Sequence, residues 1–351
     1  MSAPTVSPTV SVVMAAYNGA ALIGETLASL AAQTFADFEV LVVDDRSTDA
    51  TREVVSAFPD PRIRLIALGQ NGGPVHARNR GVAEARGRYI AGLDQDDLCL
   101  PERFARQVAW LDAHPEIALL GTQVEWLQGG RIAPSRYPVH TTPALLAFLT
   151  GLENPLAWSS VMVRADAARA LDPFTRPEIL YAEDFDLYHR IQAIGGIARL
   201  DEPLLLYRRH EGGASQRFTD TMEASAARVL TEVHAPLLGD QAGRVAHLLV
   251  VHLMRGDPVP DRATLVALGA ALTTLQAAFL DRHPCDAHDR RLIRWETARR
   301  WATIARTGLR AGTLTLADVT AVRPDHLGLG HAGPDELLLS RTLGLVRSRR
   351  G

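Results

Sequence analysis

The sequence predicts an α/β fold with a largely parallel sheet covered by helices on both faces, followed by a helical C-terminal region. Apolar, β-branched runs alternate at short spacing with amphipathic segments through residue 128. Several of those runs end abruptly in polar or acidic residues. After residue 218 the composition shifts to Ala, Leu, Arg and His without a strand pattern. We therefore expect one domain over 1–218, with halves at about 1–128 and 129–218, and a helical region over 219–351.

Composition narrows the class of protein. The chain has 351 residues, of which 47% are hydrophobic and 22% charged, which is ordinary for a globular protein of about two domains. A net charge of -3 gives no reason to expect a nucleic-acid partner. The two cysteines, Cys99 and Cys285, fit a reducing compartment. Residues 1–9 lack the pattern of a signal peptide, and the apolar runs 248–254 and 265–275 are too short to span a membrane. A cytoplasmic location is expected.

The N-terminal half reads as five strands separated by helices. The strands are predicted at 10–16, 39–45, 63–68, 89–93 and 117–127, and the helices at 22–31, 47–58, 75–86 and 101–113. No G-x-G-x-x-G follows the first strand, so the dinucleotide-binding version of the fold is excluded.

The rest of the chain is less regular. We expect a strand at the end of 158–164, a short helix over 166–171, a helix over 181–194, a strand over 203–208 and a Gly-rich loop over 210–213. Helices follow from 219 onward, with breaks near 258–260, 283–284 and 310–312, where Pro or Gly interrupts the pattern.

Polar side chains follow three strands at the point where each ends. Tyr17 and Asn18 follow the first strand, Asp44 and Asp45 end the second, and Asp94, Asp96 and Asp97 follow the fourth. The carboxyl ends of parallel strands form the ligand-binding edge of such sheets. Carboxylates at the end of an apolar strand are costly unless a cation meets them. A divalent metal, Mn²⁺ or Mg²⁺, that also holds a phosphate would explain the acids. A solvated turn that caps the next helix is the alternative.

The motifs occur in a recognisable order. They are Val10–Gly19, Gln33-Thr34-Phe35, Glu39–Asp49, Asn71–Asn79, Gly87–Asp97, Ala182-Glu183-Asp184 and Tyr207–His210. In this order they resemble the family 2 glycosyltransferases of the GT-A fold, whose mixed sheet is flanked by helices. The resemblance covers about residues 10–215 and leaves the C-terminal third uncovered.

The resemblance implies transfer of a sugar from a nucleoside-diphosphate sugar to a hydroxyl acceptor, with inversion at the anomeric carbon. UDP is the most frequent nucleotide for such a resemblance, and dTDP and GDP stay open. The acceptor would be a glycan, a lipid-linked glycan or a small molecule. The implied roles are the nucleotide site for Ala15, Tyr17, Asp45, Arg78 and Asp94, the metal site for Asp96, Asp97 and His210, the general base for Asp184, and acceptor or supporting contacts for Glu183 and Trp158. The sequence pattern Asp-x-Asp-Asp leaves open which of the acids ligates the metal.

Each role has a structural alternative. Glu183 and Asp184 are also the acids that a helix dipole favours at a helix start. Trp158 fits a core position as well as an acceptor pocket, and a histidine in a Gly-rich loop, such as His210, is often neither a ligand nor a phosphate contact. The chain departs from the family pattern at Ala15, which lacks a hydroxyl, and at Asp172-Pro173-Phe174 on the acceptor side.

Two other functions share parts of this pattern. A nucleotidyltransferase would use a similar nucleotide-binding layout but needs no counterpart of Asp184, and the phosphate loop with Gly and Lys after the first strand is missing. A non-catalytic sugar-nucleotide or glycan-binding module would keep the fold without turnover. Peripheral attachment to the inner face of the membrane and a homodimer through the C-terminal helices are both left open.

Overall fold

The computed structural model describes residues 7–210, 212–322 and 334–348, which form two units. One unit comprises residues 1–143 and 155–225, and the other comprises 144–154 and 226–351. The division therefore falls inside helix α9 (Thr219–Leu238), a few residues after the expected boundary at 218. Helix α5 (Pro143–Thr150) lies almost wholly in the second unit, where Phe148 packs edge-to-face on Phe279 at 5.4 Å between ring centroids. Its apolar sequence needs helical partners for burial, and no helix was predicted there from the sequence.

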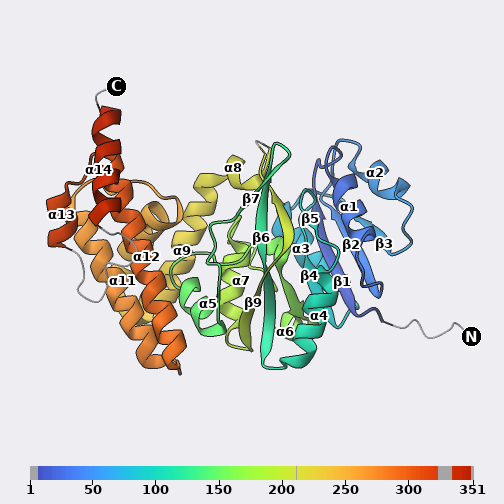
Figure 1. The fold of residues 1–351 in the computed structure, drawn as a ribbon. Coiled ribbons are helices and arrows are strands. Elements are labelled where there is room, and N and C mark those ends of the chain that lie inside the picture. The colour runs from blue at the N-terminus through green and yellow to red at the C-terminus, as the bar shows by residue number, and fades with distance from the viewer. Residues whose placement is uncertain (1–6, 211, 323–333, 349–351) are drawn as a thin grey trace, which may run out of the picture. The chain divides into compact units, whose positions relative to one another are not determined.

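The first unit is built on a nine-stranded mixed sheet in the order β3-β2-β1-β4-β8-β6-β9-β5, with β7 paired to β6 (Figure 1). The strands are β1 (Val10–Ala16), β2 (Phe38–Asp44), β3 (Ile63–Ala67), β4 (Tyr89–Gly92), β5 (Leu98–Cys99), β6 (Ile117–Gln128), β7 (Arg131–Pro134), β8 (Met162–Arg164) and β9 (Gly196–Arg208). Strands β3, β2, β1 and β4 run parallel, and β8 pairs antiparallel with both β4 and β6. The mixed sheet that the resemblance implies is confirmed, and the parallel part is confined to the first four predicted strands and the β6–β9 pair.

Helices cover both faces of the parallel part. They are α1 (Ile23–Ala31), α2 (Thr51–Ala57), α3 (Gly73–Glu84) and α4 (Arg103–Ala113). Alternate residues of β1, Val10, Val12 and Met14, join one core with the buried residues of α1, α2 and α4. The opposite face receives α3, because a Cβ on Gly81 would lie 2.5 Å from Val13. Glycine at 81 thus permits the close approach of α3 to β1.

The second half of the sheet differs most from the expected pattern. Strand β9 begins at Gly196, whereas only 203–208 was predicted, and its pairing with β6 contains register shifts near Thr122–Val124. Polar residues Arg199, Asp201 and Glu202 interrupt the alternation that identifies a strand from sequence. Strands β5 and β7 are too short for periodicity to reveal them. The remaining elements of this unit are η1 (Trp158–Ser160), α6 (Ala165–Arg169), α7 (Glu183–Ile191) and α8 (Ala214–Arg217).

The second unit is helical, and helices end near each of the three breaks that the sequence predicts, at 258–260, 283–284 and 310–312. It contains the end of α9, η2 (Gly239–Gln241), α10 (Ala242–Leu248), the π-helical η3 (Leu249–Met254), α11 (Arg262–Arg282), α12 (Ala287–Ala311), α13 (Leu316–Ala321) and α14 (Pro334–Ser348). Asp261 and Asp286 cap α11 and α12 by accepting from Thr264 N and Asp289 N at 2.7 and 2.8 Å. Gly312, with φ of 76°, ends α12 in the left-handed conformation.

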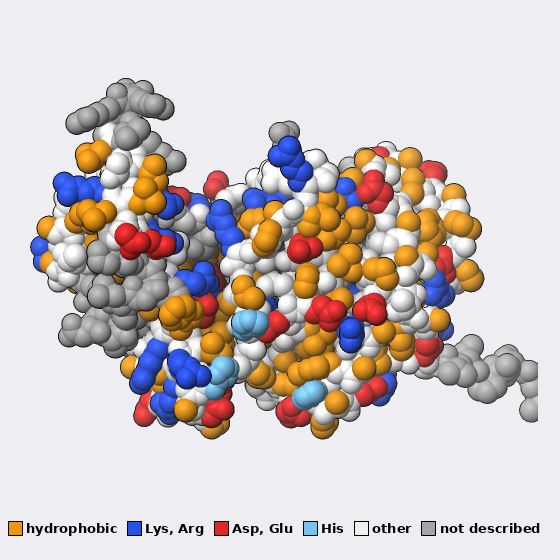
Figure 2. Space-filling view, in the orientation of Figure 1, with side chains coloured by type: hydrophobic (Ala, Val, Ile, Leu, Met, Phe, Trp, Pro, Cys, Tyr) orange, Lys and Arg blue, Asp and Glu red, His pale blue; other side chains and the backbone are white. Residues whose placement is uncertain are grey.

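Two helices of the second unit, α11 and α14, concern the expectation that no apolar segment spans a membrane. Among the described residues, α11 alone is long and apolar enough to cross a membrane, and 44% of its apolar window is buried within the structure. The apolar run expected from the sequence, 265–275, covers only part of this helix and is by itself too short to span a membrane. The core helix of a soluble protein meets the same criterion. Helix α14 exposes leucines at 338, 339, 343 and 345, and its visible surface mixes hydrophobic side chains with basic and acidic ones (Figure 2).

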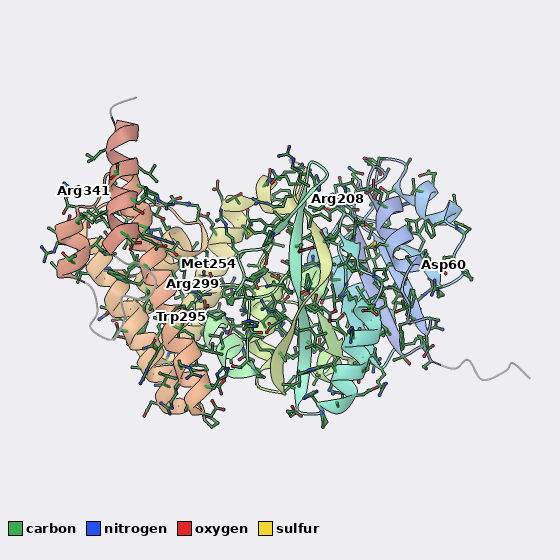
Figure 3. The ribbon with its side chains drawn as sticks, viewed as in Figure 1. Asp60, Arg208, Met254, Trp295, Arg299 and Arg341 are labelled. Atoms are coloured by element: carbon green, nitrogen blue, oxygen red, sulfur yellow. The ribbon has the colours of Figure 1, made fainter. Side chains whose placement is uncertain are left out.

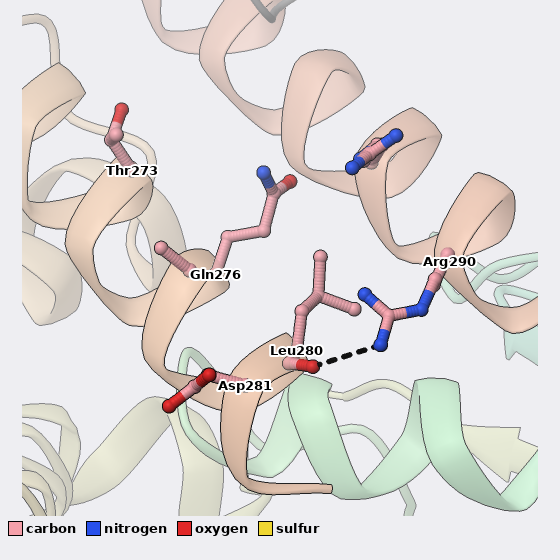
Figure 4. Close-up of a pocket in the computed structure, with 7 residues that line it drawn as sticks. Thr273, Gln276, Leu280, Asp281 and Arg290 are labelled. Atoms are coloured by element: carbon pink, nitrogen blue, oxygen red, sulfur yellow. Dashed lines mark hydrogen bonds between the residues drawn. The ribbon is translucent and has the colours of Figure 1, made fainter. Parts of the chain in front are cut away.

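A pocket of about 670 Å³ lies in the helical unit against α11 and α12 (Figure 4). Gln276, Leu280, Asp281, Arg290 and Arg294 line it with Thr273 and Ala277. The Arg290 guanidinium donates to the Leu280 carbonyl at 3.2 Å and so closes the C-terminal end of α11. None of the predicted site residues borders this pocket.

Candidate active site

The acid segment after β4 is held in place by a tryptophan and a serine of η1. A Cβ on Gly92 would lie 2.6 Å from the Trp158 ring, so glycine is required for this packing. Ser159 Oγ accepts a hydrogen bond from the Asp94 backbone N–H at 3.0 Å. Trp158 is only 4% exposed. Its position therefore fits the core role better than an acceptor contact.

Arg78, on α3, joins the two acidic motifs of the sequence. Its guanidinium donates to the Asp94 carboxylate at 2.9 Å and to the Glu183 carboxylate, and it lies over the Trp158 ring at 4.9 Å. Burial lowers the pKa of Arg78, but the charges of Asp94 and Glu183 outweigh this and hold the pKa above its ordinary value. The arginine is buried, and it links the segment after β4 to the start of α7. Charge patterning alone would place this side chain on a solvated face of the helix.

Asp96 and His210 meet at the carboxyl edge of the sheet. His210 Nε2 lies 2.8 Å from Asp96 Oδ2, and both side chains are partly exposed. Burial raises the pKa of Asp96, and the neighbouring Asp94 carboxylate raises it further, against the opposing effect of His210. A carboxylate whose pKa is raised by a second carboxylate is a site that a cation would stabilise.

Asp97 has a different environment from Asp96. It is 1% exposed, and its Oδ1 accepts from the Arg208 backbone N–H at 2.7 Å. Burial raises the pKa of Asp97 well above its ordinary value, and the Asp96 and Asp94 carboxylates add to the shift. The structure thus places Asp97 as a connection between the acid segment and the end of β9.

The ends of β1 and β2 contribute the predicted nucleotide residues. Tyr17 is exposed, Ala15 is half-buried on β1, and the Gln95 amide bonds both the Tyr17 N–H (3.0 Å) and the Tyr17 carbonyl (3.1 Å). Asp45 accepts from the backbone N–H groups of Gly72 and Gly73, each at 2.8 Å. Asp45 therefore caps α3, and its carboxylate oxygens keep lone pairs for one further donor each.

The candidate base lies at the start of α7. Asp184 is half-buried, and its Oδ1 accepts from the Phe185 backbone N–H at 2.7 Å. Burial raises the pKa of Glu183 against the lowering effect of Arg78. The neighbouring Tyr188 is fully buried, and its hydroxyl has no hydrogen-bond partner among the described residues. Burial and the Asp184 charge raise the pKa of Tyr188 well above its ordinary value.

Three residues of this site received no role from the sequence. Gln95 stands between Asp94 and Asp96, Ser159 lies where a loop was predicted, and Arg208 belongs to the Tyr207–His210 motif. The sequence assigned a function to none of the three. Arg208 (Figure 3) donates to the Asp96 carbonyl at 2.8 Å and to the Glu25 carboxylate at 2.5 Å. The three side chains form hydrogen bonds with backbone groups of distant segments. Their positions within or near the motifs are the one sequence signal that could have pointed to them.

Comparisons with known proteins agree with this fold. The model of "Glycosyl transferase family 2" matches residues 11–168. The chain is 44% identical over 146 residues to the succinoglycan biosynthesis protein ExoO of Rhizobium meliloti (strain 1021), covering 40% of this chain and 42% of that protein. It is 30% identical over 189 residues to the amylovoran biosynthesis glycosyltransferase AmsE of Erwinia amylovora, covering 52% of this chain and 69% of that protein. The match thus spans less than half of one relative and about two thirds of the other.

A solved structure shares the fold over nearly the whole chain. TarS of S. aureus (residues 1–349), solved with UDP-GlcNAc, is 18% identical with a TM-score of 0.55, covering 97% of this chain and 92% of that one. The fold is that of the GT-A sugar-nucleotide transferases. The chain belongs to glycosyl transferase family 2, and it is a glycosyltransferase.

Proposed function

We propose that this chain transfers a sugar from a UDP-sugar to a hydroxyl group of a surface polysaccharide precursor, with Asp184 as the general base and with inversion at the anomeric carbon. The relatives named for succinoglycan and amylovoran biosynthesis support the polysaccharide class of acceptor. The UDP-GlcNAc bound by TarS supports UDP as the nucleotide. The observation that carries the proposal is Arg78, which joins the Asp94 segment to Glu183, the residue next to Asp184.

The chemistry follows from this arrangement. The acceptor oxygen forms a bond to the anomeric carbon as the bond from that carbon to the diphosphate breaks on the opposite face. The electron pair leaves with the diphosphate, and the acceptor proton passes to the Asp184 carboxylate. Proton removal of this kind contributes on the order of 10²–10⁴-fold to rate. Arg78 and Glu183 fix the start of α7, where the Asp184 charge lies close enough to act on Arg78.

The donor set at Asp96 and His210 fits a divalent cation. One carboxylate and one imidazole are suitable ligands for Mn²⁺, and Mg²⁺ commonly uses one or two carboxylates together with substrate phosphates. In the part of the chain that the structure describes, no group of three or more His, Cys, Asp or Glu side chains could hold a metal ion without such help. Asp96 and His210 would hold the ion, which would neutralise charge on the leaving diphosphate. Asp97 is left out of the ligand set because it is buried and bonded to Arg208 N.

The remaining nucleotide contacts are assigned on the same basis. Tyr17 offers an exposed ring for the base, Asp45 offers spare acceptor lone pairs, and Ala15 offers only its backbone. A cytoplasmic location, peripheral membrane contact and a homodimer remain predictions that the geometry of the active site does not address.

The test is release of UDP from a panel of UDP-sugars with Mn²⁺ or Mg²⁺ and a set of glycoside acceptors, with GDP- and dTDP-sugars as the comparison. We expect UDP release that depends on the metal and a product of inverted anomeric configuration by NMR. Full activity in the presence of a chelator would remove the metal from the proposal. A preference for GDP- or dTDP-sugars would replace UDP and leave the transferase mechanism in place.

A further inference from the structure

We propose that Tyr181 and Phe218 form an aromatic platform that receives a pyranose ring of the acceptor, beside Asp184. The inference rests on the proposed function, because it names the chemical class of the acceptor for the same site. Neither aromatic residue was assigned a role from the sequence.

The two rings are stacked on each other from separate segments of the first unit. Their centroids are 4.3 Å apart and their planes differ by 6°. Tyr181 lies two residues before Glu183, at the entry to α7, and Phe218 directly follows α8. Phe218 is 36% exposed and Tyr181 is half-buried, so the pair presents aromatic surface to solvent. The stack stands three residues ahead of the proposed base, Asp184, in the chain. Exposed apolar surface at such a place is expected of a ligand contact.

The backbone of Tyr181 is held in an unfavourable conformation. Its φ is 62°, in the left-handed region that bulky residues rarely occupy. Glycine or asparagine would adopt this conformation at lower cost, yet the position carries a tyrosine. Strained backbone of this kind persists only where the surrounding structure over-determines it, and it occurs preferentially at ligand sites. In this conformation the Tyr181 ring stacks on Phe218, two residues ahead of Glu183.

The chemistry of the platform favours a sugar ring over a simple alcohol. A pyranose has one face rich in C–H groups, which carry partial positive charge, and an aromatic face is negative because of its quadrupole. The sugar hydroxyls at the ring edge remain free to reach polar groups, and one of them can face Asp184. A small acyclic alcohol has no such face and gains little from the stack.

A cation over the Phe218 ring points to an acidic sugar. The Arg217 guanidinium lies 5.5 Å from the Phe218 centroid. Burial raises the pKa of Tyr181, as does the Glu183 charge, while Arg217 acts in the opposite direction and so lies near both rings. The Arg217 side chain is exposed, and its guanidinium is positively charged. We therefore expect a uronate to bind more tightly than the neutral sugar of the same configuration.

The test is saturation-transfer difference NMR on the full chain with UDP and Mn²⁺ present. The probes are methyl β-D-glucopyranoside, methyl β-D-glucuronide and glycerol 1-phosphate, which carries an anion but no ring. We expect saturation of the ring-face C–H protons of both glycosides, stronger for the glucuronide, and little for glycerol phosphate. Phe218→Leu and Tyr181→Asn should weaken glycoside binding about tenfold, whereas Phe218→Tyr should retain it. Asparagine is chosen because it tolerates the left-handed backbone.

The matched control is Trp295→Leu, which removes an aromatic side chain that is 50% exposed in the helical unit. The proposal is overturned if the wild type gives no glycoside signals, or if Phe218→Leu leaves them unchanged. It is also overturned if Trp295→Leu reduces them as much as Phe218→Leu does. Binding of glycerol phosphate without the glycosides would also overturn it. The UDP-dependent rise in melting temperature is measured on every variant. If the wild-type protein shows no such rise with UDP, and none with GDP or dTDP, the proposed function fails. If the rise is kept and only the glycoside results go wrong, the platform alone fails.

Discussion

Arg78 and Glu183 are 105 residues apart in sequence, and the structure joins them by a buried charge-assisted hydrogen bond. The same guanidinium donates to the Asp94 carboxylate, so one arginine sets the distance between the acid segment that follows β4 and the start of α7. The two sides of the candidate active site are therefore coupled through a single side chain.

Replacing Arg78 by methionine should destabilise the protein by about 3–5 kcal/mol, because it leaves two carboxylates near one another without their cation. Urea unfolding would measure the loss. Arg80→Met is the control, since Arg80 belongs to the same helix and its pair with Glu84 is exposed, and we expect a change within about 0.5 kcal/mol. The double variant Arg78→Met with Glu183→Gln should recover part of the loss. Equal effects of Arg78→Met and Arg80→Met would contradict the bridging role.

Asp184→Asn should lower kcat by about 10²–10⁴-fold and leave the UDP-dependent melting shift unchanged, because the base acts on the acceptor and not on the nucleotide. Asp166→Asn provides the matched control. Asp166 stands in the first turn of α6 and accepts the next backbone N–H at 2.8 Å, much as Asp184 does at 2.7 Å. A kcat for Asp184→Asn near that of Asp166→Asn would assign Asp184 to helix capping alone.

The acid motif makes a prediction that separates its members. Asp96→Asn and His210→Ala should raise the Mn²⁺ concentration for half-maximal activity by about 10–100-fold, as loss of metal-site contacts commonly does. Asp97→Asn should change this concentration little, since an amide oxygen can still accept from the Arg208 N–H. The measurement is a metal titration of UDP release for each variant. The opposite order, with Asp97→Asn most affected, would show that Asp97 is the ligand.

Glu39 predicts a pH dependence of stability. Burial raises its pKa, but hydrogen bonds from Arg86 and Ser11 outweigh burial and leave the pKa below its ordinary value of 4.5. A lowered pKa in the folded state means that Glu39 stabilises the fold above pH 4.5 and loses this effect as the pH falls through the folded pKa. Glu39→Gln should therefore cost about 1.5 kcal/mol at pH 7, and the difference from wild type should shrink as the pH falls below 4.5.

Urea unfolding at pH 7, 5 and 4 measures this dependence. Glu53→Gln serves as the control, because Glu53 is exposed on α2. A cost for Glu39→Gln that stays constant over this range would mean that the hydrogen-bond geometry, and not the charge, is what stabilises the fold.

Local pattern was sufficient for the parallel half of the sheet. The buried runs of β1 and β2 are encoded within a few residues, so periodicity reveals them. The short strand β5 and the polar stretch inside β9 carried no such period and were missed or shortened. The motifs also identified the candidate acids of the site, because these acids directly follow the ends of predicted strands.

The sequence by itself determined the α/β class, the order of the first four strands along the chain and the set of acids at their carboxyl ends. Only the tertiary structure decided how those acids differ. Asp96 meets His210 across 114 residues, Asp97 turns inward to Arg208, and Arg78 is buried between Asp94 and Glu183. Periodicity reports which face of an element is buried, whereas the environment of a single carboxylate depends on which distant segments the sheet order brings beside it.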